Sequence, residues 1–244
     1  MPNAVLVHGG FHGGWCWSRV SRPLLADGWT VHAPSLTGVA DRLHLAGPDV
    51  GAMTHVNDIV SLIECEELDR VVLVGHSAGA HTAAGVAEAI PERIAAFIAL
   101  DGLVPQAGES VNDVLGESQG VPDLFRQLAA EHDGVNIPPS AFTAEAFGVT
   151  DAQDAAWVER RMTSHPLRAF EEPVPVGEGF ASIGHRLFIR CERFEAAYGQ
   201  VMVDRFSADP GWEVAHWDTG HDAMITDAGR TVEAIVGAAR AAGA

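Results

Sequence analysis

The chain contains no lysine, and all fifteen of its cationic residues are arginines. This absence excludes a Schiff-base lysine, a phosphate-binding P-loop lysine and a serine–lysine catalytic dyad, because each needs a lysine amine. The formal net charge is −18 at pH 7, since acidic residues far outnumber the arginines. A chain this acidic is a poor partner for nucleic acids and for anionic membrane surfaces. We therefore expect neither of them as a ligand.

Cysteine is scarce, and long apolar runs are missing. The three cysteines, Cys16, Cys65 and Cys191, stand far apart in the sequence, which indicates reduced thiols rather than a disulfide framework or a metal cluster. No stretch reaches about 18 apolar residues, so no membrane span is expected. A strand-like segment begins at Ala4 without a basic leader before it, which predicts a cytoplasmic protein. Nothing in the sequence calls for a metal or a cofactor.

With 244 residues and 47% hydrophobic content, the chain is long enough to bury a large core. Strand-like apolar runs alternate with helical patterns, which is typical of a parallel α/β sheet. Strands are predicted at 4–8, 30–33, 71–75, 94–100, 186–190 and 213–216. Helices are predicted around 18–26, 56–66, 78–90 and 231–242.

The alternation breaks between residues 108 and 183, where short amphipathic pieces at 122–131 and 151–162 are separated by Gly, Pro and Asn. We expect residues 1–107 and 184–244 to form the core. The insertion 108–183 is predicted to be a helical lid over the carboxyl ends of the strands, where open α/β sheets bind ligands. Its aromatic residues either line a pocket or hold the lid to the core: Phe125, Phe142, Phe147, Trp157 and Phe170.

The pentapeptide Gly75-His76-Ser77-Ala78-Gly79 lies between an apolar run and an alanine-rich helical stretch. A strand, a sharp turn and a helix are the context that a G-x-S-x-G nucleophile elbow requires. The two glycines allow the backbone to pack closely around a strained turn. We therefore predict Ser77 as a nucleophile at the N-terminus of a helix whose dipole favours developing negative charge.

A serine hydroxyl needs a base to remove its proton. His221 is the candidate, because it follows the last predicted strand and so lies at the same sheet edge as Ser77. His76 is expected to point away from the serine. The oxyanion of an acyl-transfer intermediate needs two donors, which we assign to the backbone amides of Ala78 and Gly10. The glycines at residues 9 and 10 could instead serve only a tight turn.

The order of these segments resembles a known family. The opening Val5-Leu6-Val7-His8-Gly9-Gly10-Phe11-His12-Gly13-Gly14-Trp15-Cys16-Trp17, together with the elbow, Leu100-Asp101-Gly102-Leu103-Val104-Pro105 and Asp218-Thr219-Gly220-His221-Asp222, is similar to the α/β-hydrolases of the plant methylesterase and hydroxynitrile lyase group. The resemblance implies an α/β-hydrolase fold, here with about six strands, because the chain begins at the family's third strand. We expect Phe11, His12 and Trp157 to line the substrate pocket.

The sequence departs from the family at three positions. Hydroxynitrile lyases of the group have threonine where Gly9 stands and lysine where Asp222 stands, so cyanohydrin cleavage is not expected. The family's catalytic aspartate is replaced by Phe194, although something must still orient the histidine. Asp101 is the preferred substitute, because it ends the strand that follows the elbow helix. Glu192 and Glu195 are the alternatives, and a site without any acid stays open.

Three functions are compatible with this pattern. The first is a serine hydrolase that cleaves a small, mostly apolar ester or lactone through an acyl-enzyme at Ser77. The second is a cofactor-free lyase, which performs elimination or decarboxylation on the same fold, as methylketone synthases related to this group do. The third is a non-catalytic ligand-binding protein, which would have no need of a paired nucleophile and base. Fold alone does not separate them.

Overall fold

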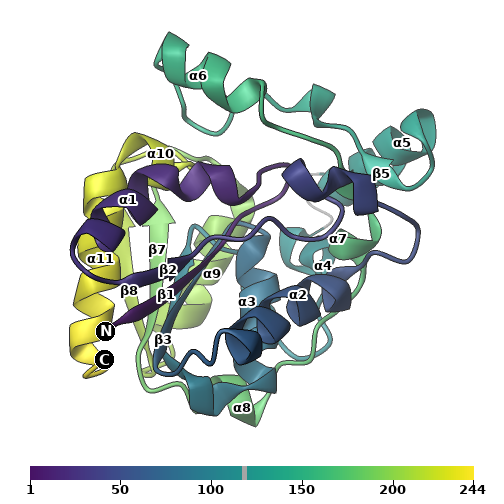
Figure 1. The fold of residues 1–244 in the computed structure, drawn as a ribbon. Coiled ribbons are helices and arrows are strands. Elements are labelled where there is room, and N and C mark those ends of the chain that lie inside the picture. The colour runs from purple at the N-terminus through teal and green to yellow at the C-terminus, as the bar shows by residue number, and fades with distance from the viewer. Residues whose placement is uncertain (117–119) are drawn as a thin grey trace.

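The computed structural model describes residues 1–116 and 120–244, and its centre is a parallel sheet of six strands (Figure 1). The strand order is β2-β1-β3-β4-β7-β8. The strands are β1 (Asn3–Val7), β2 (Thr30–His32), β3 (Val71–His76), β4 (Ile94–Leu100), β7 (Arg186–Cys191) and β8 (Trp212–Trp217). The predicted fold class and all six strands are confirmed, each strand within one residue at either end.

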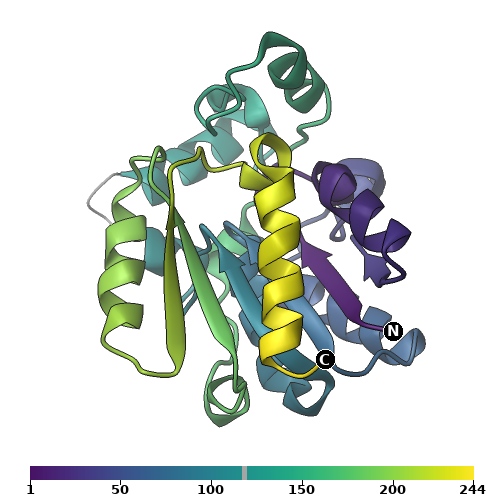
Figure 2. The same cartoon turned by 90° about the vertical axis from the view of Figure 1, so that its left-hand side faces the viewer.

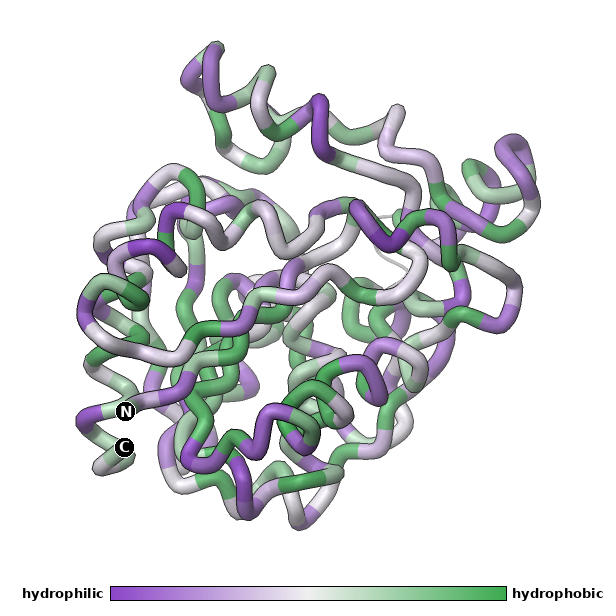
Figure 3. The backbone as a smooth tube through the Cα atoms, in the orientation of Figure 1, coloured by the Kyte–Doolittle hydropathy of each residue, from purple (hydrophilic) through white to green (hydrophobic). Residues whose placement is uncertain are grey.

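The central strands read as continuous apolar runs because helices cover both faces of the sheet. β3 is buried along its whole length, and β4 is buried at all but one residue. The edge strand β8, in contrast, is buried only at Trp217. In Figure 3, hydrophobic residues predominate in the middle of the molecule, and hydrophilic residues mark the tips of α5 and α6.

Two layers of helices enclose the sheet (Figures 1 and 2). α1 (Ser18–Ala26) and α11 (Ala228–Ala241) pack together on one face. The other face carries α2 (Ala52–Cys65), α3 (Gly79–Ala89), α8 (Glu178–Ala181) and α9 (Ala197–Ser207). α2 begins four residues before its predicted start, because the hydroxyl of Thr54 accepts a hydrogen bond from the Gly51 amide and so caps the helix.

Between β4 and β7 the chain forms small elements that lie above the carboxyl ends of the strands (Figure 1). They are α4 (Val111–Leu115), α5 (Val121–His132), α6 (Ala152–Glu159), α7 (Arg168–Glu171) and a two-stranded sheet of β5 (Asn136–Ile137) and β6 (His165–Pro166). α8 falls within the predicted lid range but packs on α3, where Glu88 accepts hydrogen bonds from the Gly177 and Phe180 amides. Residues 117–119 of the predicted lid lie outside the described residues.

Short helical turns complete the connections. They are α10 (Ala223–Thr226) and the 3-10 turns η1 (Gly14–Trp17), η2 (Ala40–Leu45), η3 (Pro91–Arg93) and η5 (Pro139–Ala141). Among the helices of residues 1–116 and 120–244, none combines the length and apolarity needed to cross a bilayer.

Candidate active site

Ser77 lies on a sharp turn between the end of β3 and the start of α3, with a left-handed φ of 51°. The turn is held by the Ser77 amide, which donates to the Leu100 carbonyl of β4 at 3.2 Å. A β-carbon at Gly75 would lie 2.4 Å from the Cα of Ala80, and one at Gly79 would lie 2.3 Å from the His8 carbonyl oxygen. Both glycines are therefore required for this close packing, and the geometry is that of a strained nucleophile elbow.

Asp101 directly follows β4, is fully buried and also has a positive φ, of 43°. Its Oδ2 lies 2.7 Å from Nδ1 of His221. Since a carboxylate only accepts hydrogen bonds, Nδ1 of His221 carries the proton of this bond, and in the neutral ring Nε2 then presents its lone pair. The other oxygen, Oδ1, accepts from Nη1 of Arg190 and from the Cys191 amide, each at 3.1 Å. Both oxygens of this buried carboxylate are thus satisfied.

The alternative acids lie elsewhere. Glu192 is exposed and pairs with His216 on β8, while Glu195 is exposed on the loop before α9. Neither makes a hydrogen bond to His221 among the contacts of the described residues. The ring of Phe194 stacks on His221 instead, with 4.2 Å between the ring centroids and 26° between their planes. An aromatic face thus covers the imidazole at the point where the family usually has its acid.

Sequence analysis did not identify Arg190 and Tyr198 as part of this site. Nη2 of Arg190 donates to the Phe194 carbonyl at 2.6 Å, so one guanidinium joins Asp101 to the Phe194 backbone. A β-carbon at Gly199 would lie 2.2 Å from Arg190 Nη1, so the absence of a side chain there makes room for the guanidinium. An arginine inside an apolar strand was the available signal, because such residues are rarely buried without a partner.

Tyr198 closes the site from α9, and its hydroxyl donates to the Asp101 carbonyl at 3.1 Å. Burial and the Asp101 carboxylate raise the pKa of Tyr198 well above its ordinary value. The phenol therefore stays protonated and keeps this hydrogen bond at neutral pH. It is the only tyrosine of the chain, but no spacing in the sequence pointed to it.

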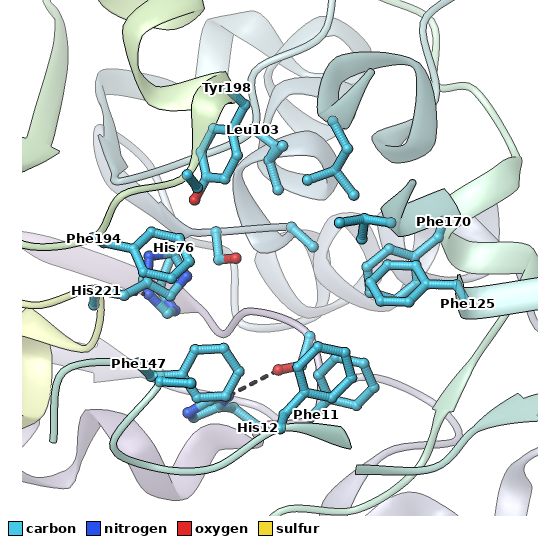
Figure 4. A pocket seen from close by; sticks show the side chains of 18 residues that line it. Phe11, His12, His76, Leu103, Phe125, Phe147, Phe170, Phe194, Tyr198 and His221 are labelled. Atoms are coloured by element: carbon cyan, nitrogen blue, oxygen red, sulfur yellow. Dashed lines mark hydrogen bonds between the residues drawn. The ribbon is translucent and has the colours of Figure 1, made fainter. Parts of the chain in front are cut away.

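A cavity of about 220 Å³ brings the predicted residues together (Figure 4). His76, His221 and Phe194 gather on one side of it, and Phe125 and Phe170 lie on the opposite side. Gly10, Phe11, His12, Ser77 and Ala78 line it as well. The remaining lining residues are mainly apolar: Leu103, Leu115, Val121, Phe142, Ala146, Phe147, Ala196 and Tyr198. No Asp, Glu or Arg side chain is among the described residues that form this lining.

The prediction that Trp157 lines the substrate pocket is wrong, because Trp157 is not among the residues that line the cavity. Its ring packs edge-on against Trp15, with centroids 5.0 Å apart, and the guanidinium groups of Arg19 and Arg161 lie over it. Arg19 of α1 also pairs with Asp154 of α6. Trp157 therefore holds α6 to the core, which is the other role that the sequence left open for the lid aromatics.

His76 is among the residues that line the cavity, and its ring lies beside that of His221 with 4.5 Å between the centroids. Its Nε2 donates to the His221 carbonyl at 3.1 Å. Burial, together with the neighbouring histidines, lowers the pKa of His76 well below its ordinary value. His76 is therefore neutral at physiological pH, and its hydrogen bond helps to position the loop that carries His221.

Comparison with known proteins agrees with this geometry. A model described as "Alpha/beta hydrolase family" matches residues 4–234, which is nearly the whole chain. The protein belongs to the alpha/beta hydrolase family. The resemblance of the opening segment, the elbow and the histidine loop to this family is thus confirmed.

Named relatives narrow the class of this alpha/beta hydrolase. The "Carbendazim hydrolyzing esterase" of Nocardioides sp. (strain SG-4G) is 34% identical over 232 residues, covering 92% of this chain and 94% of the relative. "Methylesterase 3" of Arabidopsis thaliana is 28% identical over 246 residues, covering 92% and 90%. The chain spans only 55% of "Putative methylesterase 11, chloroplastic" of Arabidopsis thaliana, at 26% identity. The hydrolase is therefore an enzyme of the esterase kind.

Solved structures show the same fold. An extracellular alpha/beta-hydrolase from a Paenibacillus species superposes with a TM-score of 0.79 at 22% identity, covering 98% of this chain and 99% of that one. Tomato Methylketone Synthase I, in complex with 2-tridecanone, gives a TM-score of 0.78 at 18% identity, with 98% of each chain covered. At such identities the likeness shows the fold alone.

Proposed function

We propose that this alpha/beta hydrolase cleaves small, mostly apolar carboxylic esters or lactones through an acyl-enzyme at Ser77. The observation that carries the proposal is the 2.7 Å contact between His221 Nδ1 and Asp101 Oδ2, beside a cavity that Ser77 also lines. Because Asp101 fixes the proton on Nδ1, Nε2 of His221 presents its lone pair and serves as the base. Asp101 then stabilises the imidazolium that forms.

The reaction follows in two halves. Ser77 Oγ attacks the carbonyl carbon while its proton moves to Nε2 of His221, and the oxyanion is held by the Gly10 and Ala78 amides. The intermediate collapses, and the alcohol leaves with the proton from His221. A water molecule then attacks the acyl-enzyme with His221 again as base. The carboxylate departs, and Ser77 regains its proton.

The cavity and its surroundings support a neutral, largely apolar substrate. Its polar lining atoms come from histidine, serine, tyrosine and backbone groups, and six of its eighteen lining residues are phenylalanines. The sequence range 108–183, which supplies the elements above the cavity, contains thirteen acidic and four basic residues, so approaching anions meet repulsion that weakens with salt. The names of the relatives, methylesterases and a carbendazim-hydrolysing esterase, further support a small ester. Methyl esters should therefore be hydrolysed faster than the corresponding free-acid or phosphorylated analogues.

The alternative is a cofactor-free lyase, and one observation favours it: Phe194 stacks on His221 where the family usually has its acid. Elimination needs His221 only to take a proton from carbon, and the departing carboxylate keeps its own oxygens. A non-catalytic binding protein is disfavoured, because the buried Asp101–His221 pair has no role in holding a neutral ligand.

Turnover in ¹⁸O-labelled water separates the two reactions. The substrates are a series of p-nitrophenyl esters and methyl esters. Hydrolysis should place one ¹⁸O atom in each released carboxylate. A fluorophosphonate probe should label the wild type, and Ser77→Ala should abolish both labelling and turnover. Transfer of the acyl group to added methanol would report the acyl-enzyme directly. An unlabelled acid released together with a new alkene, or full activity of Ser77→Ala, would overturn the proposal.

A further inference from the structure

His12 lines the cavity, but both of its ring nitrogens are engaged on its other side. Nδ1 lies 2.8 Å from the Gly10 carbonyl oxygen (Figure 4). Nε2 lies 2.9 Å from Oδ2 of Asp222. A carbonyl and a carboxylate only accept hydrogen bonds, whereas a neutral imidazole has one donor. Both contacts are satisfied together when His12 carries two ring protons and is an imidazolium.

Burial makes this charge assignment consequential. The side chain of His12 is 1% exposed and that of Asp222 is fully buried. Burial alone would lower the pKa of His12, but the Asp222 carboxylate and the Gly10 carbonyl outweigh it and raise that pKa above its ordinary value. A buried carboxylate without a countercharge is costly. An imidazolium at His12 supplies that countercharge.

Among the described residues near Asp222, His12 is the one that can act as its countercharge. Nε2 of His76 lies 3.7 Å from Asp222 Oδ1 and donates to the His221 carbonyl, and the pKa of His76 is lowered. Burial and the Asp222 charge raise the pKa of the Cys16 thiol, so it stays neutral. Asp222 Oδ1 has no hydrogen-bond partner. On the far side, Trp15 stacks on the His12 ring with centroids 5.2 Å apart.

The pair joins the two loops on which the proposed chemistry depends. Asp222 follows His221 directly, and Gly10 lies two residues before His12 on the loop after β1. Between them, Phe11 has a left-handed φ of 65°, and its amide donates to the ring of His165 at 3.4 Å. The hydrogen bond from His12 to the Gly10 carbonyl therefore closes a strained turn. It fixes the plane of the Gly10–Phe11 peptide, which adjoins the peptide that carries the Gly10 N–H.

We propose that His12 and Asp222 form a charged positioning pair that sets the oxyanion loop at Gly10 relative to the His221 loop. The inference rests on the proposed function, because it assigns the pair a part in holding the Gly10 amide. When the pair is broken, the strained turn at Phe11 is no longer held by the His12 hydrogen bond. The Gly10 amide then shifts relative to the oxyanion that it binds. Misplacement on the scale of 1 Å costs on the order of 10²-fold in rate.

The variant Asp222→Asn tests the pair, because it keeps the shape and removes the charge. Its kcat should fall by on the order of 10–10²-fold, while KM stays close to the wild-type value. The affinity for a trifluoromethyl ketone, which mimics the oxyanion, should fall by a similar factor. The matched control is Asp218→Asn, an exposed acid on the same loop, which should leave all three quantities unchanged. A kcat for Asp222→Asn equal to that of the control would overturn the proposal.

A second measurement does not depend on activity. In ¹⁵N-histidine NMR spectra of the wild type at pH 8, both nitrogens of His12 should carry protons, whereas Asp222→Asn should show a neutral ring. His12→Gln identifies the signal by its loss. A neutral His12 in the wild type at pH 8 would overturn the proposal even if Asp222→Asn does not fold. Failure of the proposed function would instead appear as activity retained in Ser77→Ala, with the His12 spectrum unchanged.

Discussion

At the scale of single residues, backbone strain marks the site. Three of the six non-glycine residues with positive φ among the described residues, Phe11, Ser77 and Asp101, lie at or beside the cavity. Such conformations persist only where the surrounding structure holds them, and they gather at functional sites. At Asp101 the backbone amide donates a hydrogen bond to the Ile189 carbonyl at 2.7 Å, and the carboxylate accepts hydrogen bonds from Arg190 and His221. We therefore infer that Asp101, whose Oδ2 lies 2.7 Å from His221 Nδ1, is the acid that orients His221.

The first prediction concerns that acid. Asp101→Asn should lower kcat by on the order of 10³–10⁴-fold, because an amide no longer selects the tautomer of His221 that accepts the serine proton. Glu192→Gln and Glu195→Gln serve as controls, since both side chains are exposed, and they should retain wild-type activity in a p-nitrophenyl ester assay. The reverse ranking would return the acid to the usual loop and leave Asp101 with a structural role.

The second prediction concerns Arg190, whose side chain is 10% exposed and bonds the fully buried Asp101 carboxylate. Arg190→Met should lower the free energy of unfolding by about 3 kcal/mol, because it leaves a buried charge without its partner. Arg193→Met is the matched control, since Arg193 pairs with Asp218 in solvent, and it should not change stability measurably. Urea unfolding of the three proteins measures the difference. Equal stability of both variants would show that Asp101 does not need the guanidinium.

At the scale of elements, the sequence allowed the prediction of the strands that are continuous apolar runs. The four inner strands stand out because buried parallel strands are apolar on both faces. The pairing of Asp101 with Arg190 could not be found in this way, because it joins residues 89 positions apart through side-chain contacts. α9 was not predicted either, although its Gly199 and Tyr198 complete the acid's surroundings. Sequence motifs thus suggested Ser77 and His221 and favoured Asp101 over Glu192 and Glu195, but they carried no sign of the contacts that surround Asp101.

The lid shows the same limit at the position of Trp157. Helical spacing indicates that this face of α6 packs against the protein, but not whether it faces the cavity or the core. The structure decides for the core, through Trp15 and the bond between Arg19 and Asp154. Phe142, in contrast, lines the cavity and stacks on Phe11 with centroids 4.5 Å apart.

The third prediction follows from this contrast. Phe142→Ala should raise KM for an apolar p-nitrophenyl ester roughly tenfold or more, because burying a phenylalanine contact contributes about 1.5–3 kcal/mol. Trp157→Ala should leave KM near the wild-type value and instead lower the thermal midpoint, since it loosens α6 from α1. Steady-state kinetics and thermal unfolding of both variants provide the comparison. A larger KM effect from Trp157→Ala would place that residue at the cavity after all.

At the scale of the whole molecule, buried histidines set the response to acid. Burial lowers the pKa of His8 to about 3 and that of His81 to about 4. It also lowers the pKa of His55, His76 and His165. These rings stay neutral in the folded chain at pH values where the unfolded chain binds protons. His12 acts in the opposite sense, because its raised pKa adds stability that is lost as the pH rises.

The fourth prediction is that the free energy of unfolding falls as the pH is lowered from 7.5 to 5. At pH 5, His8 and His81 are each protonated only in the unfolded chain, which costs about 2 kcal/mol per residue. Lowering the pH also makes the net charge less negative than its value of −18 at pH 7. The weaker repulsion between like charges stabilises the folded chain and so opposes the loss of stability. At about 0.15 M salt, exposed charges are screened beyond roughly 8 Å, whereas the buried rings are not. The histidine effect should therefore dominate, and urea unfolding at pH 7.5, 6 and 5 measures it.

His81→Gln keeps a donor for the Glu109 carbonyl that His81 now contacts at 3.1 Å, and it should remove about 2 kcal/mol of the decline. His44→Gln, at an exposed position, should leave the decline unchanged, because this ring is hydrated in both states. A decline of equal size in all three proteins would mean that His81 takes up its proton without unfolding.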